Sequence, residues 1–392
     1  MSMARKVYIR EASYDYRRLK PVVFEMMDAC GAHIPRGGLV LLKPNFLSPA
    51  PPEKAMLTHP LVVRAVSEYV LEKGGRPQIS DSPAVGAFEK ILKEGGFREA
   101  LSGLDVRFSE FRESVPVAAP SMPYGIRPPF PKLELAKDAL DAELIINLPK
   151  LKTHAQMLLT LGIKNLFGCV VGLRKPEWHF RAGVDRQMFA SLLVQVWAAL
   201  RPAVTLLDGV LALEGDGPGK GGVPRRLGLL FASSSAPALD IAVCRTLGIE
   251  PGRVPTNEAA GKMGFHAEEI EIDGAKQKYP VENFVLPGQA MDVIFGPKRF
   301  HGAMRAHLLQ RPVVNEDLCK LCGECLSYCP AGAIEKKDAE GKKESRLAFD
   351  YEKCIRCYCC LEVCPQGAIR AREPMAGKLV GKTIKAVHDL LD

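Results

Sequence analysis

Two runs of cysteines near the C-terminal end restrict what this chain can fold into more than any other feature. The runs share one spacing and each closes on a proline: Cys319, Cys322, Cys325 and Cys329 before Pro330, then Cys354, Cys357, Cys360 and Cys364 before Pro365. Steps of three residues let one tight loop place three thiolates on a cubane iron–sulfur cluster, while the fourth crosses to the neighbouring cluster. The spacing predicts two 4Fe–4S clusters, one held by Cys319, Cys322, Cys325 and Cys364 and the other by Cys329, Cys354, Cys357 and Cys360.

Other uses of these cysteines fit the sequence less well. Disulfides are rare in reducing compartments, and nothing in the chain suggests export. Zinc sites use paired Cys-x2-Cys units without the closing proline. Cys359 falls outside the repeated spacing, so we expect it to pack against its neighbours. The small residues at 331–333 and 367–368 are expected to let backbone amides approach the sulfurs.

The composition describes a soluble globular chain of two or three domains. It has 392 residues, of which 47% are hydrophobic, and contains no apolar run long enough to span a bilayer. Residues 1–18 carry five lysines and arginines but no apolar stretch of signal-peptide length, so we expect a cytoplasmic protein. The formal charge is +8 and no nucleic-acid motif is present, which favours an anionic small molecule and a redox partner protein or reductase over nucleic acid.

Residues 1–274 alternate short β-branched runs with helix-like segments, which predicts an α/β domain on an open, mostly parallel sheet. The predicted strands lie at 6–10, 39–42, 77–80, 144–146, 204–207 and 227–231, and the first helices at 16–30 and 60–73. A proline-rich stretch at 105–135 suggests an inserted hairpin. The remaining predictions are a linker at 275–310 with a basic helix around 299–309, a small α+β ferredoxin domain of the bacterial two-cluster type at 311–374 with a charged turn at 335–344, and a C-terminal helix at 375–392.

Polar side chains follow several predicted strands at the points where those strands end. They are Lys43, Asn45, Asp81, Ser82, Lys150, Lys152 and Asp208. In open parallel sheets, ligands bind outside the carboxyl ends of the strands. We therefore predict that these groups share one crevice, and we take Lys43, Asn45, Asp81 and Asp208 as candidate ligand-binding residues.

The segment 214–222 follows the predicted Asp208 strand and is too rich in glycine for a strand or helix. It does not match a Walker A loop, because Glu214 holds the first glycine position and Gly221 the hydroxyl position. A mobile lid, an acidic ligand loop that includes Glu214 and an ordinary surface turn all remain open. The chain also lacks a Gly-x-Gly-x-x-Gly motif opening a helix, so a nicotinamide fold is not indicated.

Lys150, Lys152, His154 and Lys164 form the densest polar group outside the cysteine runs, and we take them as candidate catalytic residues. Several ammonium groups near one crevice repel each other unless an anion or acidic side chains neutralise them. This group therefore suggests a phosphate- or carboxylate-bearing ligand, although some of the lysines can instead extend along the surface into water.

Histidines and carboxylates add two further possibilities. The candidate proton carriers are His59, His154 and His179, since imidazole titrates near neutrality, although a single histidine is more often structural. A second metal site is conceivable from Asp81, Asp208, Glu214 and Asp240. Aspartates at strand ends often cap the following helix instead.

Four motifs, in order along the chain, resemble the DUF362 family in its form with a fused ferredoxin domain. They are Lys43-Pro44-Asn45, the segments 147–154 and 162–168, and Asp208-Gly209 followed by residues 214–218. Asp216 is a small departure, since asparagine is more usual there. The resemblance implies iron–sulfur binding without a settled reaction, and its third motif adds Asn165 to the candidate ligand-binding residues. Such α/β domains are also distantly similar to the lactate racemase type, which holds a nickel cofactor.

Three hypotheses about function follow. The first is an iron–sulfur oxidoreductase in which the ferredoxin domain passes single electrons to an anionic substrate or cofactor in the α/β crevice. The second is an electron carrier or assembly protein that uses the α/β domain to dock a partner and has no chemistry of its own. The third is metal-cofactor chemistry of the racemase type.

Overall fold

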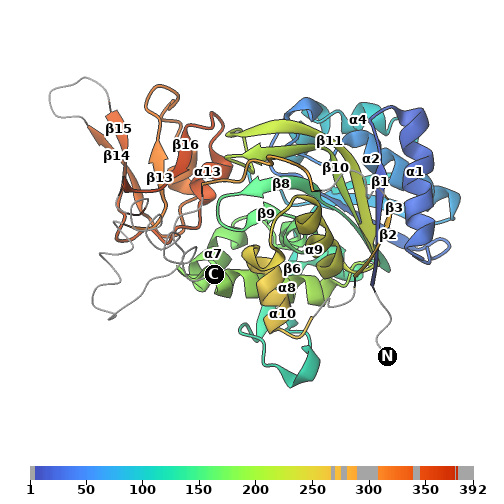
Figure 1. Ribbon diagram of the computed structural model, residues 1–392. Coiled ribbons are helices and arrows are strands. Elements are labelled where there is room, and N and C mark those ends of the chain that lie inside the picture. Colours follow the sequence, from blue (N-terminus) through green and yellow to red (C-terminus); the bar gives the residue numbers. More distant parts are fainter. Residues whose placement is uncertain are drawn as a thin grey trace.

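A mostly parallel sheet of ten strands forms the centre of the N-terminal part of the chain, as the sequence predicts (Figure 1). The computed structural model describes residues 5–265, 270–274, 280–288, 308–338, 345–375 and 377. The strands of this sheet are β1 (Arg5–Glu11), β2 (Leu39–Pro44), β3 (Arg76–Asp81), β4 (Arg107–Glu110), β7 (Leu144–Leu148), β8 (Lys150–His154), β9 (Leu158–Thr160), β10 (Val204–Gly215), β11 (Gly222–Ser233) and β12 (Ile270–Gly274).

The order of the strands is β12-β1-β11-β10-β7-β2-β3-β4, and β8 pairs with β10 and β9. Strands β11 and β9 run antiparallel to their neighbours, and the other pairings are parallel. The carboxyl ends of β2, β3, β7 and β8 therefore point toward the same edge of the sheet. This edge is where ligands bind in open α/β sheets.

Helices cover both faces of the sheet and bury its apolar side chains. On one face lie α1 (Tyr16–Ala29), α2 (Pro60–Glu72), α3 (Phe88–Glu94) and α4 (Phe97–Ala100). On the other face lie α5 (Lys137–Asp141), α6 (Gly162–Asn165), α7 (Arg174–Ala182), α8 (Arg186–Leu200), α9 (Ala236–Thr246) and α10 (Pro255–Lys262). The result is a three-layer α/β domain.

Short polar side chains fix where the main helices begin. The carboxylates of Asp15 and Asp185 accept hydrogen bonds from the first backbone amides of α1 and α8, and the hydroxyl of Ser235 does the same for α9. Such caps satisfy amides that have no partner within the helix. Pro60 opens α2, where its missing N–H costs no hydrogen bond.

The sequence misplaces two strands near the predicted crevice. Residues 150–154 were expected as a polar segment after a strand, but they form the buried strand β8. Strand β10 was expected to end at Asp208, but it continues to Gly215. The apolar residues beyond Asp208 pair with β11, with an irregularity between Gly209 and Leu211, and this pairing extends the hairpin well past the other strands. Pairing with distant strands thus decides where β8 lies and where β10 ends.

The stretch at 105–135 contains the expected hairpin, made of β5 (Ser114–Ala118) and β6 (Lys132–Ala136). The basic helix predicted around 299–309 and the C-terminal helix at 375–392 lie almost entirely outside the described residues, as does most of the charged turn at 335–344.

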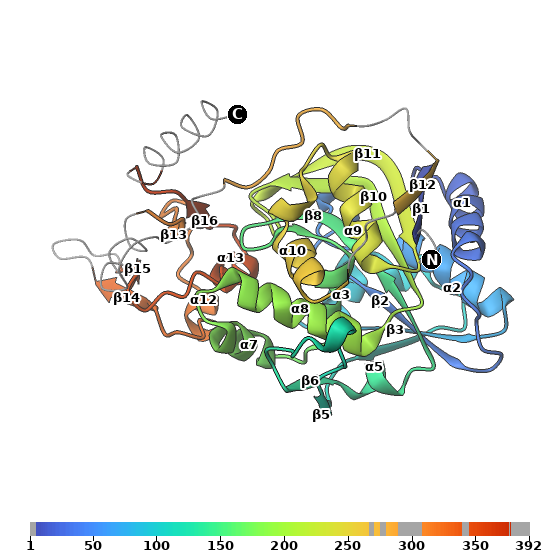
Figure 2. The same ribbon diagram turned by 60° about the horizontal axis from the view of Figure 1, so that its bottom comes forward.

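The cysteine-rich segment forms a small separate domain beside the sheet (Figures 1 and 2). Its described residues form two antiparallel strand pairs and two short helices: β13 (Arg311–Val314) with β16 (Ile369–Arg372), β14 (Ile334–Asp338) with β15 (Ser345–Phe349), α12 (Glu324–Ser327) and α13 (Cys359–Val363). Its small apolar core also includes Ala155, which follows β8. The two domains therefore pack against each other at the carboxyl end of β8.

Candidate functional site

Four of the cysteines surround a common cavity, as their spacing predicts. One cavity of about 320 Å³ is lined by Cys319, Cys322, Cys325 and Cys364. Burial, and then the charges of Cys357, Cys354, Cys329 and Cys325, raise the pKa of the Cys360 thiol, so Cys360 lies near Cys329 as well as near the cysteines of its own run. The first group thus combines three cysteines of one run with the last cysteine of the other, and the second group stays a prediction from the spacing.

The backbone around the thiols also fits a cluster. The amide of Ala333 donates to the sulfur of Cys329 at 3.3 Å, and the amide of Ala368 donates to the sulfur of Cys364 at 3.2 Å. These are the small residues expected from the sequence to let the chain approach the sulfurs. Such hydrogen bonds stabilise thiolate ligands and tune the potential of a cluster. The donor set and its surroundings therefore suit 4Fe–4S clusters.

A second cavity, of about 470 Å³, lies between the α/β domain and the ferredoxin domain. We call it the junction pocket. Its α/β lining follows the carboxyl ends of β2 and β3, the strands β8 and β9, and the segment from α6 to α7. The polar residues that line it are Asn45, Asp81, Ser82, Lys152, His154, Thr160, Lys164, Asn165, Lys175 and, from α13, Glu362.

Asp81 lines the junction pocket and is paired with Lys43, which does not line it. The ammonium of Lys43 lies 2.8 Å from the Asp81 carboxylate, and both side chains are buried. Asp81 also accepts from the backbone amides of Phe46 and Ser82. A side chain at Gly168 would collide with this pair, so glycine is needed for the close approach of the backbone.

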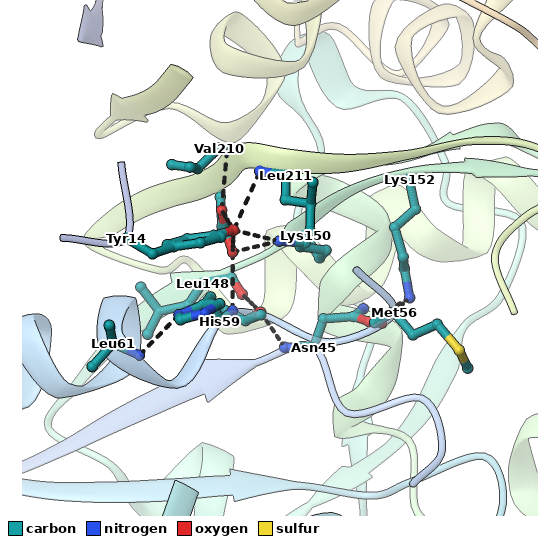
Figure 3. A network of polar contacts seen from close by, with 12 residues as sticks. Tyr14, Asn45, Met56, His59, Leu61, Leu148, Lys150, Lys152, Val210 and Leu211 are labelled. Atoms are coloured by element: carbon teal, nitrogen blue, oxygen red, sulfur yellow. Dashed lines mark hydrogen bonds and ion pairs between the residues drawn. The ribbon is translucent and has the colours of Figure 1, made fainter. Parts of the chain in front are cut away.

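A chain of amide side chains holds Lys152 in place. The Lys152 ammonium donates to Asn45 Oδ1 at 2.7 Å and to the carbonyl of Met56 at 2.8 Å (Figure 3). Asn45 in turn donates to Asn165, and Asn165 donates to Asn147 and to the carbonyl of Lys43. The two sequence candidates Asn45 and Asn165 thus act together, as supports for Lys152.

Four polar side chains of the junction pocket lack a complete set of partners. His154 Nε2 and Glu362 Oε1 lie 2.9 Å apart, but neither is aligned for a hydrogen bond. The hydroxyl of Thr160 is also buried without a partner. Lys164 lines the same cavity, and no contact within hydrogen-bond distance is recorded for its ammonium among the described residues. Unsatisfied buried groups that converge on a cavity indicate a place for a ligand.

Burial lowers the pKa values of the lysines in the junction pocket and so favours their neutral forms. It lowers the pKa of Lys152 to about 7, with a further contribution from the nearby Lys164 charge. It lowers the pKa of Lys175 to about 8, and that of Lys164 falls as well. An anion bound among these three ammonium groups would restore their charge, since opposite charges favour the ionised form.

Lys150 and Asp208 contact each other and do not line the junction pocket. The Lys150 ammonium lies 2.7 Å from the Asp208 carboxylate and 2.9 Å from the hydroxyl of Tyr14. Asp208 also accepts from Tyr14 and from the backbone amide of His59. The rings of Tyr14 and His59 stack, with centroids 3.5 Å apart. The residues predicted to share one crevice thus fall into two groups. Lys150 and Asp208 form the group that connects β8, β10 and the start of α2.

The remaining acidic candidates each have a structural partner. Glu214 pairs with Arg225 at 2.9 Å and accepts from the amide of Val285, and it does not line the junction pocket. Asp240 accepts from the amides of Gly162 and Ile163 at the start of α6. Within the described residues, no three His, Cys, Asp or Glu side chains come close enough to hold a single metal ion. Thiols around a larger iron–sulfur cluster stand further apart than such ligands do.

Residues 216–221 of the glycine-rich segment form the turn of the β10–β11 hairpin, whereas residues 214, 215 and 222, which were not expected in strands, belong to β10 and β11. Pro218 lines the junction pocket, and Gly219 lies against the backbone of α13. The hairpin therefore reaches from the sheet to the ferredoxin domain.

The three histidines proposed as proton carriers do not titrate near neutrality. Burial lowers the pKa of His59 and of His154 to about 4 and that of His179 to about 3. Their imidazoles are therefore neutral at pH 7, and Lys152 is the pocket group whose charge changes there.

Sequence reasoning missed three residues of the junction pocket: Lys175, Thr160 and Glu362. Lys175 and Thr160 stand in no motif that sequence could have flagged. Glu362 lies between Cys360 and Cys364, where the cluster spacing alone gave it no role.

Comparison with known proteins agrees with this two-part organisation. The domain described as "Domain of unknown function (DUF362)" matches residues 40–245, and the domain described as "4Fe-4S dicluster domain" matches residues 318–368. A thylakoid-associated protein of Synechocystis sp. is 38% identical over 297 residues, which cover 74% of this chain and 90% of that protein.

The structure of the lactate racemase apoprotein from Thermoanaerobacterium thermosaccharolyticum also aligns, with a TM-score of 0.35 and 13% identity. The alignment covers 59% of this chain and 54% of that one, so it spans about half of the racemase. In the described part of the chain, no helix is both long and apolar enough to cross a membrane.

Replacing Lys150 is expected to destabilise the α/β domain. Lys150→Met leaves the Asp208 carboxylate buried without its ion-pair partner, and breaking such a pair costs about 3–5 kcal/mol. Denaturant unfolding, followed by circular dichroism, measures the loss. Lys54→Met, at an exposed lysine, is the control and should leave the unfolding midpoint unchanged. Equal midpoints for the two variants would show that the buried pair contributes nothing.

Sulfate should bind to the junction pocket more weakly as the pH rises. Sulfate keeps its charge near neutrality, so the dependence comes from the protein: Lys152 loses its proton as the pH passes about 7, and Lys175 follows at about 8. The charges that act on Lys152 are those of Lys164, Glu362, Lys150 and Asp81.

Titration calorimetry at constant ionic strength should show sulfate affinity falling severalfold from about pH 6 to about pH 9, as lysine ammonium groups deprotonate. In Lys152→Met, affinity at the acid end should drop about tenfold, as expected for loss of one charged hydrogen bond. Lys54→Met should follow the wild type. A flat pH profile in the wild type contradicts the assignment.

Proposed function

We propose that this chain, which belongs to the DUF362 family and carries a 4Fe–4S dicluster domain, is an oxidoreductase that passes single electrons from two clusters to an anionic ligand in the junction pocket. The observation that carries the proposal is the position of α13. This helix supplies Cys360 to one group of thiols and Glu362 to the lining of the pocket. A group that accepts electrons in the pocket would thus lie next to a cluster.

Burial of the cysteines suggests the direction of electron flow. Cys322, in the first group, is exposed, whereas Cys357 and Cys360, in the second group, are buried and belong to the same segment as Glu362. We infer that a redox partner protein or reductase donates electrons at the exposed group. The buried group then passes them to the pocket.

The lining of the pocket supports an anion as the acceptor. Lys152, Lys164 and Lys175 converge there, and Asp81 is already paired with Lys43. In a cavity partly shielded from water, ammonium groups bind carboxylate or phosphate more strongly than they would at the surface. We infer that these three lysines hold the ligand.

The clusters, when bound, supply the one-electron chemistry, and the chain's own residues orient the acceptor and limit water access. Asn45 and the carbonyl of Met56 fix the direction of the Lys152 ammonium. Pro218 and Glu362 close the side of the pocket that faces the ferredoxin domain.

The second hypothesis, a carrier or assembly protein that docks a partner with its α/β domain, gains no support from Lys150 and Lys152. Both side chains are buried, and a partner protein cannot reach their ammonium groups.

A cytoplasmic location is also a proposal, because the Synechocystis relative is called thylakoid-associated. Fractionation of cells that express the tagged chain distinguishes a cytoplasmic from a membrane-associated location. Recovery of the chain in the washed membrane fraction would contradict the cytoplasmic location.

Anaerobic reconstitution should load about eight iron and about eight acid-labile sulfide per chain, as two 4Fe–4S clusters require. Cys360→Ser should lose about half of this content, because one cluster loses a ligand. The matched control is its neighbour: Cys359→Ser should retain the full content. Iron far below eight per chain, or equal loss in the two variants, contradicts the assignment of clusters.

Electron delivery to the pocket can be tested with small carboxylates that accept electrons. Reduced holoprotein, freed of reductant, should be reoxidised by fumarate or pyruvate under anaerobic conditions, as followed by visible absorbance. Lys164→Met should slow this reaction about tenfold, because it removes one ammonium group that holds the carboxylate. Ferricyanide, which reacts at the surface, should oxidise both proteins equally. If neither carboxylate reoxidises the wild type, or if Lys164→Met reacts as fast, the proposal is wrong.

A further inference from the structure

The junction pocket contains a hydrogen-bond acceptor, the Glu362 carboxylate, to which none of the pocket lysines donates. Glu362 lines the cavity among three lysines, yet its Oε1 atom has no hydrogen-bond partner. The lysines are held elsewhere: Lys152 donates to Asn45 and to Met56, and Lys175 donates to the carbonyl of Ser82 at 2.6 Å. The Glu362 carboxylate is therefore not neutralised by a hydrogen-bonded lysine.

His154 cannot serve as the missing donor in its observed position. Its Nδ1 atom accepts from the backbone amides of Gln156 and Met157, so the neutral ring carries its hydrogen on Nε2. That hydrogen is misaligned with Glu362 Oε1, although the two heavy atoms are 2.9 Å apart. The side chain of His154 is 1% exposed and faces the cavity. It therefore needs an acceptor there, while Glu362 needs a donor.

Thr160 adds a third group with open capacity. It lies opposite Lys152 in the β8–β9 pair, is 3% exposed, and its hydroxyl has no partner. A hydroxyl both donates and accepts. A purely accepting anion such as sulfate would satisfy the lysines and His154, but it would bring a second negative charge beside Glu362. A ligand that combines an anion with a donor would satisfy all of these groups.

We infer that the natural ligand of the junction pocket is a small anion that also carries a hydroxyl or ammonium group, and that Glu362 of the ferredoxin domain accepts a hydrogen bond from that group. This inference rests on the proposed function, because it concerns the ligand of the same pocket. Glu362 is then a residue that determines specificity.

The place of Glu362 in the chain gives binding a spectroscopic signature. It lies two residues after Cys360 and two before Cys364, and these two cysteines belong to different thiol groups. A ligand that bonds Glu362 touches the segment that carries ligands of both clusters. Hydrogen bonding and charge near a cluster change its electronic properties. Ligand binding should therefore alter the paramagnetic resonance spectrum of the reduced protein.

Three four-carbon dicarboxylates provide a matched test, because they differ at one carbon only. Succinate carries hydrogen there, malate a hydroxyl and aspartate an ammonium group. Titration calorimetry on the reconstituted full chain should show malate or aspartate binding at least tenfold more tightly than succinate. A site built to receive a donor rejects the analogue that lacks it.

The variant Glu362→Gln should remove this preference and the spectral change on binding, while Glu362→Asp should restore part of both. Glu352→Gln makes the same chemical change at an exposed position of the ferredoxin domain and should behave as the wild type. Iron and sulfide content shows that each variant retains its clusters. Should Glu362→Gln lose them, the wild-type comparison of the three acids still decides.

The outcomes separate this inference from the proposed function. Sulfate or succinate binding as tightly as malate and aspartate leaves an anion pocket in place but overturns the role of Glu362. An unchanged preference in a loaded Glu362→Gln protein overturns it as well. No binding of sulfate or of any of the three acids overturns both.

Discussion

The burial of lysine ammonium groups at one edge of a sheet is the constraint on which the rest of this structure depends. Lys43, Lys150, Lys152 and Lys175 are all buried, and removing a charge from water costs several kcal/mol unless partners compensate for it. Two of these lysines pair with aspartates, and the other two donate to carbonyl or amide oxygens. Satisfying these groups fixes the loops that follow β2 and β3 and the path of β8.

The charges of these buried lysines are compensated to different degrees. This difference separates the lysine that stabilises the fold from the lysines that can bind a ligand. Lys150 has a full ion pair with Asp208 and a bond to Tyr14, so it stabilises the fold. Lys152 and Lys175 have neutral partners only, and their pKa values fall to about 7 and about 8. A buried cation with neutral partners gains most from a nearby anion. The junction pocket is therefore suited to an anion because its own side chains leave those lysines under-compensated.

The ferredoxin domain completes this pocket instead of lying apart from it. Helix α13 brings Glu362 to the ends of β8 and β9, and the β10–β11 hairpin packs against the same helix. A short helix that carries both a thiol of one group and a wall of the pocket makes the separation between them small. The fusion of the two domains in one chain therefore keeps the thiol group close to the pocket.

The sequence by itself determined the cysteine-rich domain and its first thiol group, the α/β class, most strand positions and the polar ends of β2 and β3, because these depend on spacing and local pattern. It could not place residues 150–154 or the end of β10, since pairing with distant strands overrides local polarity there. It could not separate Lys150 from Lys152, which stand two residues apart in one strand with different partners. Only the tertiary structure brought Lys175, Thr160 and Glu362 to one cavity, because contacts between segments far apart in sequence leave no periodic signal.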